Sequence, residues 1–200
     1  LVAARAAEIG ARLGCEKTSV TADGTAVDVF IETHGPRPQL VIVGAVHVAV
    51  PLVHFARLLG FRTVVVDPRS AFATRERFPH ADELIVDWPD RAFASVRFHA
   101  GTCVAVLSHD MKIDVPALAL ALRQPLAYVG ALGSRKTRQK WRAALEAAGV
   151  PARDVDRIRA PIGLDLGGRR AEEVALAIVA EIVAVTRGGT AVRTGERAST

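Results

Sequence analysis

The chain has 200 residues, of which half are apolar and only 5% are aromatic, and its formal net charge is +5. A domain of this size buries about 70% of its unfolded surface, so it requires neither disulfides nor a structural metal. Two cysteines are too few for a disulfide framework, they lack metal-ligand spacing, and the sequence shows no signal peptide, so we expect a cytoplasmic protein. No stretch approaches the roughly 18 apolar residues of a membrane span, and the basic charge suits anionic partners, phosphorylated small molecules as well as nucleic acid.

Residues 1–38 are predicted to form a small unit that precedes the main domain. Residues 1–13 are rich in alanine with helical spacing and predict a short helix, and the alternation over residues 26–31 predicts a strand. Residues 34–38 contain two prolines, which restrict themselves and the residues before them, so this segment is predicted to be a stiff linker. The domain boundary is therefore expected after Pro38.

Residues 39–187 predict a Rossmann-like α/β fold, a doubly wound parallel sheet with helices on both faces. Strands that alternate with helices are typical of this architecture. Residues 188–200 are polar and are expected to form a flexible tail. Strands are predicted at 40–43, 63–66, 83–86, 102–107 and 126–129, and helices at 47–59, 116–122, 134–148, 151–159 and 172–185.

Ligands of such sheets bind outside the carboxyl ends of the strands, where the strand order reverses. Four segments are predicted to meet there, at 44–48, 67–69, 108–110 and 130–135. With one residue from the later glycine-rich loop, they supply the candidate cofactor-binding residues: Gly44, His47, Asp67, Arg69, His109, Asp110, Gly130, Gly133, Ser134, Arg135 and Asp165.

The first of these turns has only part of a dinucleotide fingerprint. Val46 stands where the fingerprint needs a glycine to let a pyrophosphate approach. Asp67 follows the second strand, where it either binds a ribose or closes a turn with Pro68. His47 either contacts a ligand or hydrogen-bonds at a helix start. Binding of NAD(P) is therefore kept as an alternative.

The remaining candidates are also open to two interpretations. His109 and Asp110 end a central strand and could carry out acid–base chemistry, although adjacent strand residues point to opposite faces. The segment Gly130-Ala-Leu-Gly-Ser-Arg-Lys-Thr137 predicts a turn in which Ser134 caps a helix whose start could bind an anion, with Arg135 or Arg138 adding charge. Asp165 either caps a turn or contacts a ligand.

Taken together, these segments resemble the C-terminal Rossmann domain of the XdhC/CoxI family over residues 39 to about 187. Val46 takes the place of a glycine in the family's Gly-Ala-Gly-His-Val pattern. Residues 1–33 resemble only the end of the family's N-terminal domain. The stretches that carry the resemblance are Leu40-Val-Ile-Val-Gly-Ala-Val-His-Val48, Leu59-Gly-Phe-Arg-Thr-Val-Val-Val-Asp-Pro-Arg69, Phe72-Ala-Thr-Arg-Glu-Arg-Phe-Pro79, Ala81-Asp-Glu-Leu84, Ser108-His-Asp110, Tyr128-Val-Gly-Ala-Leu-Gly-Ser-Arg135 and Pro161-Ile-Gly-Leu-Asp-Leu-Gly167.

The resemblance implies an accessory factor rather than an enzyme. Such a protein binds the molybdenum cofactor (molybdopterin), protects it during sulfuration and passes it to the apoenzyme of a molybdenum hydroxylase of the xanthine dehydrogenase or CO dehydrogenase type. It also implies a homodimer and contact with a cysteine desulfurase. The alternatives are an NAD(P)-dependent oxidoreductase and a degenerate interaction module that binds no ligand. Nucleic-acid binding is not expected, because no recognisable motif supports it.

Overall fold

The computed structural model describes residues 15–22, 25–32 and 35–191, and the chain divides into two compact units between Arg37 and Pro38. The helix predicted at residues 1–13 lies outside the described residues, as do residues 192–200 of the predicted tail. Among the described residues, no helix is long and apolar enough to cross a membrane.

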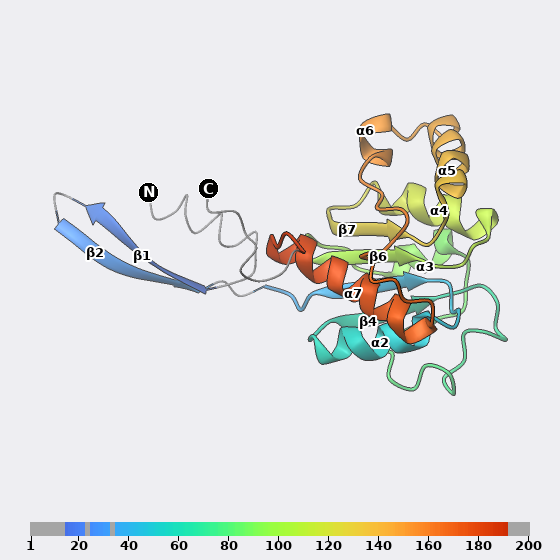
Figure 1. The fold of residues 1–200 in the computed structure, drawn as a ribbon, viewed down its shortest axis with the longest axis horizontal. Helices are drawn as coiled ribbons and strands as arrows, with labels where there is room; N and C mark the ends of the chain where they lie inside the picture. The colour runs from blue at the N-terminus through green and yellow to red at the C-terminus, as the bar shows by residue number, and fades with distance from the viewer. Residues whose placement is uncertain (1–14, 23–24, 33–34, 192–200) are drawn as a thin grey trace. The chain divides into compact units, whose positions relative to one another are not determined.

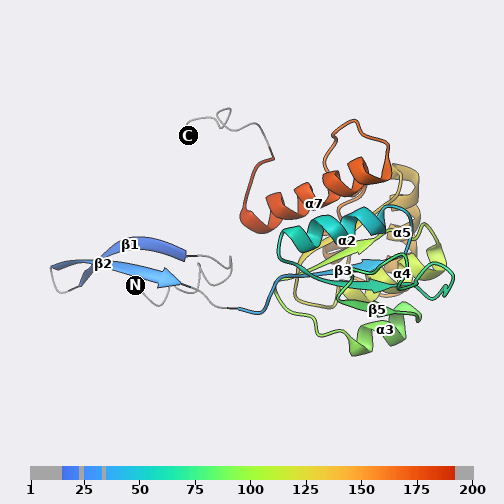
Figure 2. The same ribbon diagram turned by 90° about the horizontal axis from the view of Figure 1, so that it is seen from below.

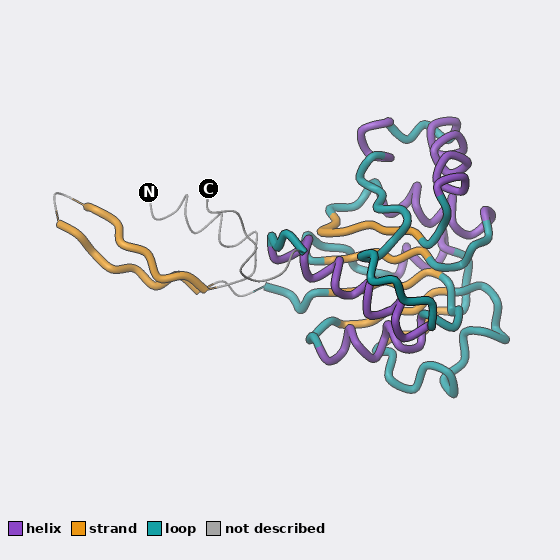
Figure 3. Tube along the Cα trace, viewed as in Figure 1, coloured by secondary structure: helices purple, strands orange, loops and turns teal. Residues whose placement is uncertain are grey.

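The first unit is an antiparallel hairpin of β1 (Cys15–Ala22) and β2 (Thr25–Glu32), in which Cys15 pairs with Glu32 (Figure 3). Strand β2 confirms the strand predicted at 26–31. Strand β1 was not predicted because its sequence, Cys-Glu-Lys-Thr-Ser-Val-Thr-Ala, lacks the alternation of apolar and polar residues that marks a half-buried strand. Polar contacts support the pairing instead, since Asp28 accepts a hydrogen bond from the Ser19 hydroxyl at 2.5 Å and pairs with Lys17 at 2.8 Å.

The second unit is built on a five-stranded sheet in the order β5-β4-β3-β6-β7, and every pair of neighbours is parallel (Figure 1). This order confirms the predicted Rossmann-like fold. The strand sequences are almost wholly apolar because both faces of the sheet are covered. The strands are β3 (Gln39–Val43), β4 (Arg62–Val66), β5 (Glu83–Ile85), β6 (Thr102–Val106) and β7 (Leu126–Ala131).

Helices cover both faces of the sheet (Figure 2). Alternate residues of β3 show the division, since Leu40 and Ile42 pack in one core while Val41 and Val43 pack in the other. Helices α2 (Ala49–Leu58) and α7 (Ala171–Arg187) contribute to the first core. Helices α3 (Pro89–Ser95), α4 (Met111–Ala121), α5 (Arg135–Ala147) and α6 (Ala152–Val155) contribute to the second.

Two predicted helices differ from the observed ones, and one observed helix was not predicted. Helix α4 starts at Met111 rather than at Pro116, because the Asp110 side chain accepts a hydrogen bond from the Lys112 N–H at 2.9 Å and caps the helix. The short helix α3, which starts at Pro89, was not predicted, because its seven residues are too few to show a clear helical period. Helix α6 ends at Val155, well before the predicted residue 159.

The chain after α6 runs along the free edge of β7 and extends the sheet by a single bridge. Arg159 donates its N–H to the Val129 carbonyl at 3.0 Å and accepts from the Ala131 N–H at 2.9 Å. These bonds explain why the predicted helix at 151–159 stops early, since the backbone groups of Arg159 are paired with the sheet instead of with a helix.

Candidate functional site

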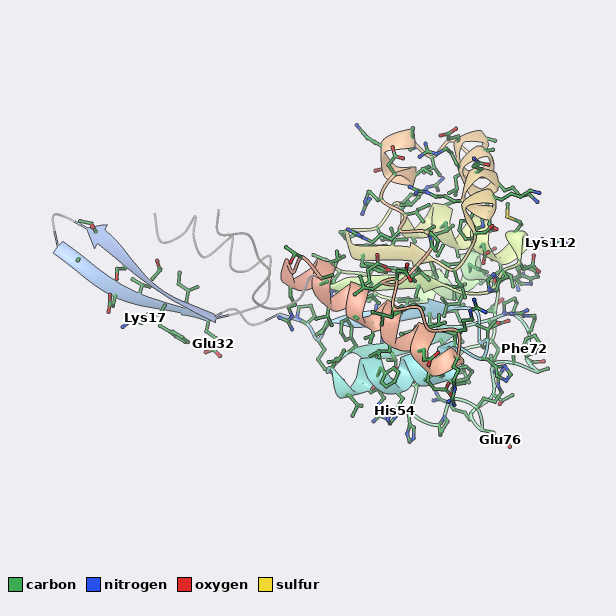
Figure 4. All side chains as sticks on the ribbon, in the orientation of Figure 1. Lys17, Glu32, His54, Phe72, Glu76 and Lys112 are labelled. Atoms are coloured by element: carbon green, nitrogen blue, oxygen red, sulfur yellow. The ribbon has the colours of Figure 1, made fainter. Side chains whose placement is uncertain are left out.

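The strand order reverses between β3 and β6, which are hydrogen-bonded neighbours whose following helices, α2 and α4, cover opposite faces. The chain segments that leave these two strands flank the crevice in which doubly wound sheets bind ligands. Figure 4 shows Phe72 and Lys112 at the end of the second unit toward which the strands point. We therefore describe the candidate site from the turns at this end.

Gly44 directly follows β3 and adopts a positive φ of +107°. A Cβ at this position would lie 2.6 Å from the backbone nitrogen of Ser108, which is closer than real contacts allow. The glycine is therefore required by the close approach of the β3 and β6 turns rather than by a ligand. Val46, in the same turn, is half-buried and packs against the core under α2 and α7.

His47 is exposed and lies in the turn before α2. The N-cap of α2 is Val48, and no side chain caps the helix, so the predicted helix-start hydrogen bond of His47 is not formed. Within the described part of the chain, the imidazole has no hydrogen-bond partner. It is therefore free to contact a ligand.

Asp67 is fully buried at the end of β4, and its carboxylate is occupied by neighbours in the chain. One oxygen accepts from the Ala45 N–H at 2.7 Å and from Arg69 Nη2 at 2.7 Å. The other accepts from Arg69 N at 2.9 Å and Arg69 Nε at 2.8 Å. Burial by itself raises the pKa of Asp67, but the hydrogen bonds from Arg69 and Ala45 outweigh it and hold the pKa below its usual value. Of its two predicted roles, this arrangement favours the turn-closing one.

Arg69 connects Asp67 to the rest of the crevice. Its guanidinium lies over the ring of Phe72, 4.5 Å from the ring centre, and its side chain is about a third exposed. The hydrogen bonds to Asp67 raise the pKa of Arg69, and the nearby carboxylates of Asp110 and Asp114 raise it further. Arg69 is thus the cation that lies between the turns after β4 and β6.

The sequence did not reveal the part that Arg77 plays in this site. Its Nη1 atom donates to the Ala45 carbonyl at 2.8 Å and to the Phe72 carbonyl at 2.7 Å. Because Asp67 binds the Ala45 N–H, both backbone polar groups of Ala45 are held by side chains. The only sequence signal for this role was the presence of arginines in the loop between β4 and β5. Their spacing did not indicate which backbone carbonyl groups they bind.

His109 and Asp110 follow β6 but have different surroundings. His109 is exposed and adopts φ +61°, a left-handed conformation that costs a non-glycine residue about 1 kcal/mol. Asp110 caps α4, and its backbone N–H donates to Ser108 Oγ at 3.2 Å. The Asp110 carboxylate is therefore used by the helix, and nothing in the geometry pairs it with the His109 ring for acid–base chemistry.

Asp114 is a buried acid beneath this turn that the sequence interpretation missed. Ser108 Oγ donates to its carboxylate at 2.5 Å. Burial raises the pKa of Asp114 to about 6, opposed by the Ser108 hydrogen bond and the charge of His109. Trp141 lies close enough to lower this pKa slightly, yet its buried Nε1 has no hydrogen-bond partner of acceptable geometry in the described residues. Since Asp114 lies inside a helix of mostly apolar residues, only its isolation among them could have indicated burial.

The predicted turn at Gly130–Gly133 was placed incorrectly, because Gly130 lies inside β7. A Cβ on Gly130 would lie 2.5 Å from the Tyr128 hydroxyl, and one on Gly133 would lie 2.4 Å from the Trp141 ring. Neither glycine has a positive φ. Both therefore make room for packing, rather than allowing the chain to turn.

The other two candidates in this part of the chain hold local structure. Ser134 is exposed and caps α5, accepting from the Thr137 N–H at 3.2 Å, as predicted. Arg135 begins α5, and its side chain is outside what the structure describes. Asp165 is exposed and accepts from the Gly167 N–H at 3.3 Å within its own loop, which favours the turn-capping role.

His47, Arg69 and His109 thus follow the carboxyl ends of the strands with hydrogen-bonding groups available to a ligand, whereas the carboxylates of Asp67 and Asp110 are occupied. No group of three or more His, Cys, Asp or Glu side chains in the described residues could hold a metal ion. The arrangement offers imidazoles and a cation to an anionic ligand.

Comparison with known proteins gives one family. The family model described as the XdhC Rossmann domain matches residues 40–182. A protein of Bacillus subtilis (strain 168), named as a probable xanthine dehydrogenase subunit, is 32% identical over 156 residues, which cover 78% of this chain and 45% of that protein. A protein of Escherichia coli (strain K12) named molybdenum cofactor insertion chaperone PaoD is 34% identical over 94 residues, 47% of this chain and 30% of that protein.

A solved structure shows the same fold. The crystal structure of a protein from Bacillus halodurans, described as a xanthine dehydrogenase, has a TM-score of 0.68 and 29% identity, and the match covers 87% of this chain and 49% of that one. The chain therefore spans less than half the length of each of these relatives.

Proposed function

Because the chain belongs to the XdhC Rossmann domain family, we propose that it is an accessory factor in the maturation of a molybdenum hydroxylase of the xanthine dehydrogenase or CO dehydrogenase type. In this proposal it binds the molybdenum cofactor and delivers it to the apoenzyme, without catalysing a reaction of its own. The observation that carries the proposal is the match to a family in which one relative is named a molybdenum cofactor insertion chaperone and another is named for xanthine dehydrogenase.

The residues at the strand ends fit the chemistry of this cofactor, a pterin that bears a phosphate and carries molybdenum for the hydroxylase reaction. His47 and His109 are exposed imidazoles that can donate hydrogen bonds to anionic oxygens. Arg69 is held in place by Asp67, and its partly exposed guanidinium has further N–H groups that can donate to an anionic oxygen. The exposed start of α5 at Ser134 adds backbone N–H groups that favour an anion.

The same geometry gives less support to an NAD(P)-dependent oxidoreductase. Asp67, the residue expected to bind a ribose, is buried and accepts four hydrogen bonds from Ala45 and Arg69. A ribose hydroxyl could reach this carboxylate only if Arg69 moved away. Val46 also stands where close approach of a pyrophosphate needs glycine. A ligand-free interaction module is the remaining alternative.

The proposal includes the partners that such a role requires. These are the hydroxylase apoenzyme, a cysteine desulfurase that supplies the sulfur, and a second copy of the chain in a homodimer, all in the cytoplasm. Residues 39–187 form the cofactor-binding domain in this proposal, and residues 1–33 resemble the end of the family's N-terminal domain.

The test is retention of the isolated cofactor by the purified chain under anaerobic conditions. The chain is separated from free cofactor by gel filtration, and the oxidised pterin in the protein fraction is measured by fluorescence. We expect saturable retention that His47→Ala and His109→Ala each reduce severalfold. His54→Ala is the matched control, because His54 is exposed on the outer face of α2 (Figure 4). Retention below detection in the wild type, or equal retention by all four proteins, would overturn the assignment of this site.

A further inference from the structure

A polar cavity lies beside the edge strand β7. It has a volume of about 450 Å³ and is bounded by residues 156–161, by Arg138 of α5 and by Glu181 of α7. Another cavity of about 420 Å³ adjoins it and shares Arg159 and Glu181. These volumes are in the range of small-molecule sites, roughly 300–1,000 Å³.

Three arginines, Arg138, Arg157 and Arg159, line the first cavity, and their charges are only partly balanced. Asp156 is shared with Arg142, which lies outside the cavity. Arg157 lies 3.8 Å from Asp154. Arg138 has no acidic partner among the residues that the structure describes. The cavity therefore has a surplus of guanidinium groups, the side chains best suited to bidentate contacts with phosphate.

Of the three arginines, Arg159 is the best positioned to bind an anion in the cavity. Its backbone is bonded to β7 on both sides, as described above, so the origin of its side chain is fixed at the strand edge. Its guanidinium is about half exposed and lies 3.6 Å from the carboxylate of Glu181. A guanidinium with five donors can keep this contact and still turn others toward a ligand.

Glu181 links several residues that surround the cavity and leaves part of the Arg159 guanidinium available to a ligand. It is buried, and one of its oxygens accepts from the Tyr128 hydroxyl at 2.5 Å and from the Gly163 N–H at 2.8 Å. Its other oxygen faces Arg159. These contacts fix the carboxylate of Glu181, which in turn holds one end of the Arg159 guanidinium and leaves its other donors directed elsewhere.

The adjoining cavity has a different lining, which includes the apolar side chains of Leu164, Ala184 and Val185. A ligand that spans the two cavities would therefore need one strongly anionic end and one less polar body. We propose that this pair of cavities binds a small phosphate ester, with the phosphate against Arg138 and Arg159 and the organic part toward Leu164 and Val185. Arg138 lies in the first turn of α5, next to the proposed cofactor site, whereas Arg159 and Leu164 are not part of that site, so the Arg159 variant tests this assignment alone.

The test is isothermal titration of the purified full chain with adenosine monophosphate, inorganic phosphate and acetate at constant ionic strength. The expected order is saturable binding of the ester, at least about tenfold weaker binding of phosphate, and no binding of acetate. Arg138→Ala and Arg159→Ala should each weaken binding of the ester about tenfold or more, the size of one charge-assisted contact.

Arg153→Ala is the matched control, since Arg153 is exposed on the neighbouring helix α6 and does not line either cavity. It should leave the affinity within a factor of two. The proposal is overturned if the ester does not bind saturably, if it binds no more tightly than phosphate or acetate, or if Arg153→Ala weakens it as much as Arg159→Ala does. Unchanged binding in Arg159→Ala, together with loss in His47→Ala, would place the phosphate at the strand ends and overturn it as well.

Discussion

Replacement of Asp114 by asparagine should stabilise the protein at neutral pH. Asp114 is 1% exposed, and burial raises its pKa from 3.8 to about 6. The folded state therefore binds the proton more tightly than the unfolded state does. Asparagine is the uncharged isostere, and its side-chain oxygen can still accept the hydrogen bond from Ser108.

The size of the stabilisation, and the pH range over which it is seen, follow from this pKa shift. A difference of about two pKa units corresponds to about 3 kcal/mol, so Asp114→Asn should be more stable than the wild type by up to about 3 kcal/mol above pH 7. Because the folded pKa is raised, the wild type regains this stability as the pH falls through about 6 toward 4. The advantage of the variant should therefore disappear near pH 4.

The assay is urea unfolding of both proteins at pH 7.5, 6, 5 and 4, from which the difference in the free energy of unfolding is taken at each pH. Asp90→Asn on α3 is the matched control, because an exposed carboxylate carries no burial cost, and this substitution should not stabilise the protein at pH 7.5. A destabilised Asp114→Asn at pH 7.5, or a difference that does not change with pH, would refute the reasoning about this buried acid.

Three further substitutions test the turns around the crevice, each by urea unfolding, and by ligand titration where stated. Gly44→Ala should lower the free energy of unfolding by about 3 kcal/mol or more, because of the positive φ and because the new Cβ would lie 2.6 Å from the backbone nitrogen of Ser108. A loss below about 1 kcal/mol would contradict the packing role of this glycine. Asp67→Ala should cost about 2–4 kcal/mol, since it leaves Arg69 and the Ala45 N–H unpaired, and an unchanged stability would show that these bonds contribute nothing. Val46→Gly should cost about 1 kcal/mol in packing but strengthen binding of a phosphorylated ligand, and unchanged affinity would mean that the first turn does not bind the phosphate.

The sheet could be predicted because buried parallel strands leave a plain signal. The strands around Val41, Val64 and Val104 are short apolar runs that each end in a turn-forming residue, and both faces of each strand are buried. Helix boundaries were harder, as Pro116 illustrates. It was interpreted as a helix start, but the cap at Asp110 begins the helix five residues earlier. Capping is set by one side-chain hydrogen bond, which hydrophobic periodicity does not report.

The location of the candidate site could be predicted from the sequence, but the contacts between its residues could not. From the sequence, the residues after β3, β4 and β6 were predicted to lie at one end of the sheet, and they do, because parallel strands have their carboxyl ends at the same edge. It could not show that Asp67 binds Ala45 and Arg69, nor that Gly44 and Gly133 accommodate a neighbouring backbone and Trp141. These contacts join residues far apart in the chain, and residue type alone does not indicate the partner.

Hydrogen–deuterium exchange of the chain with and without the isolated molybdenum cofactor tests the central claim most directly. Bound cofactor should slow exchange of the backbone amides in residues 44–48, 67–72 and 107–110, while residues 156–161 beside β7 keep their free rate. Slowed exchange confined to residues 156–161, or no change in any segment at saturating cofactor, would contradict a cofactor site at the carboxyl ends of the strands.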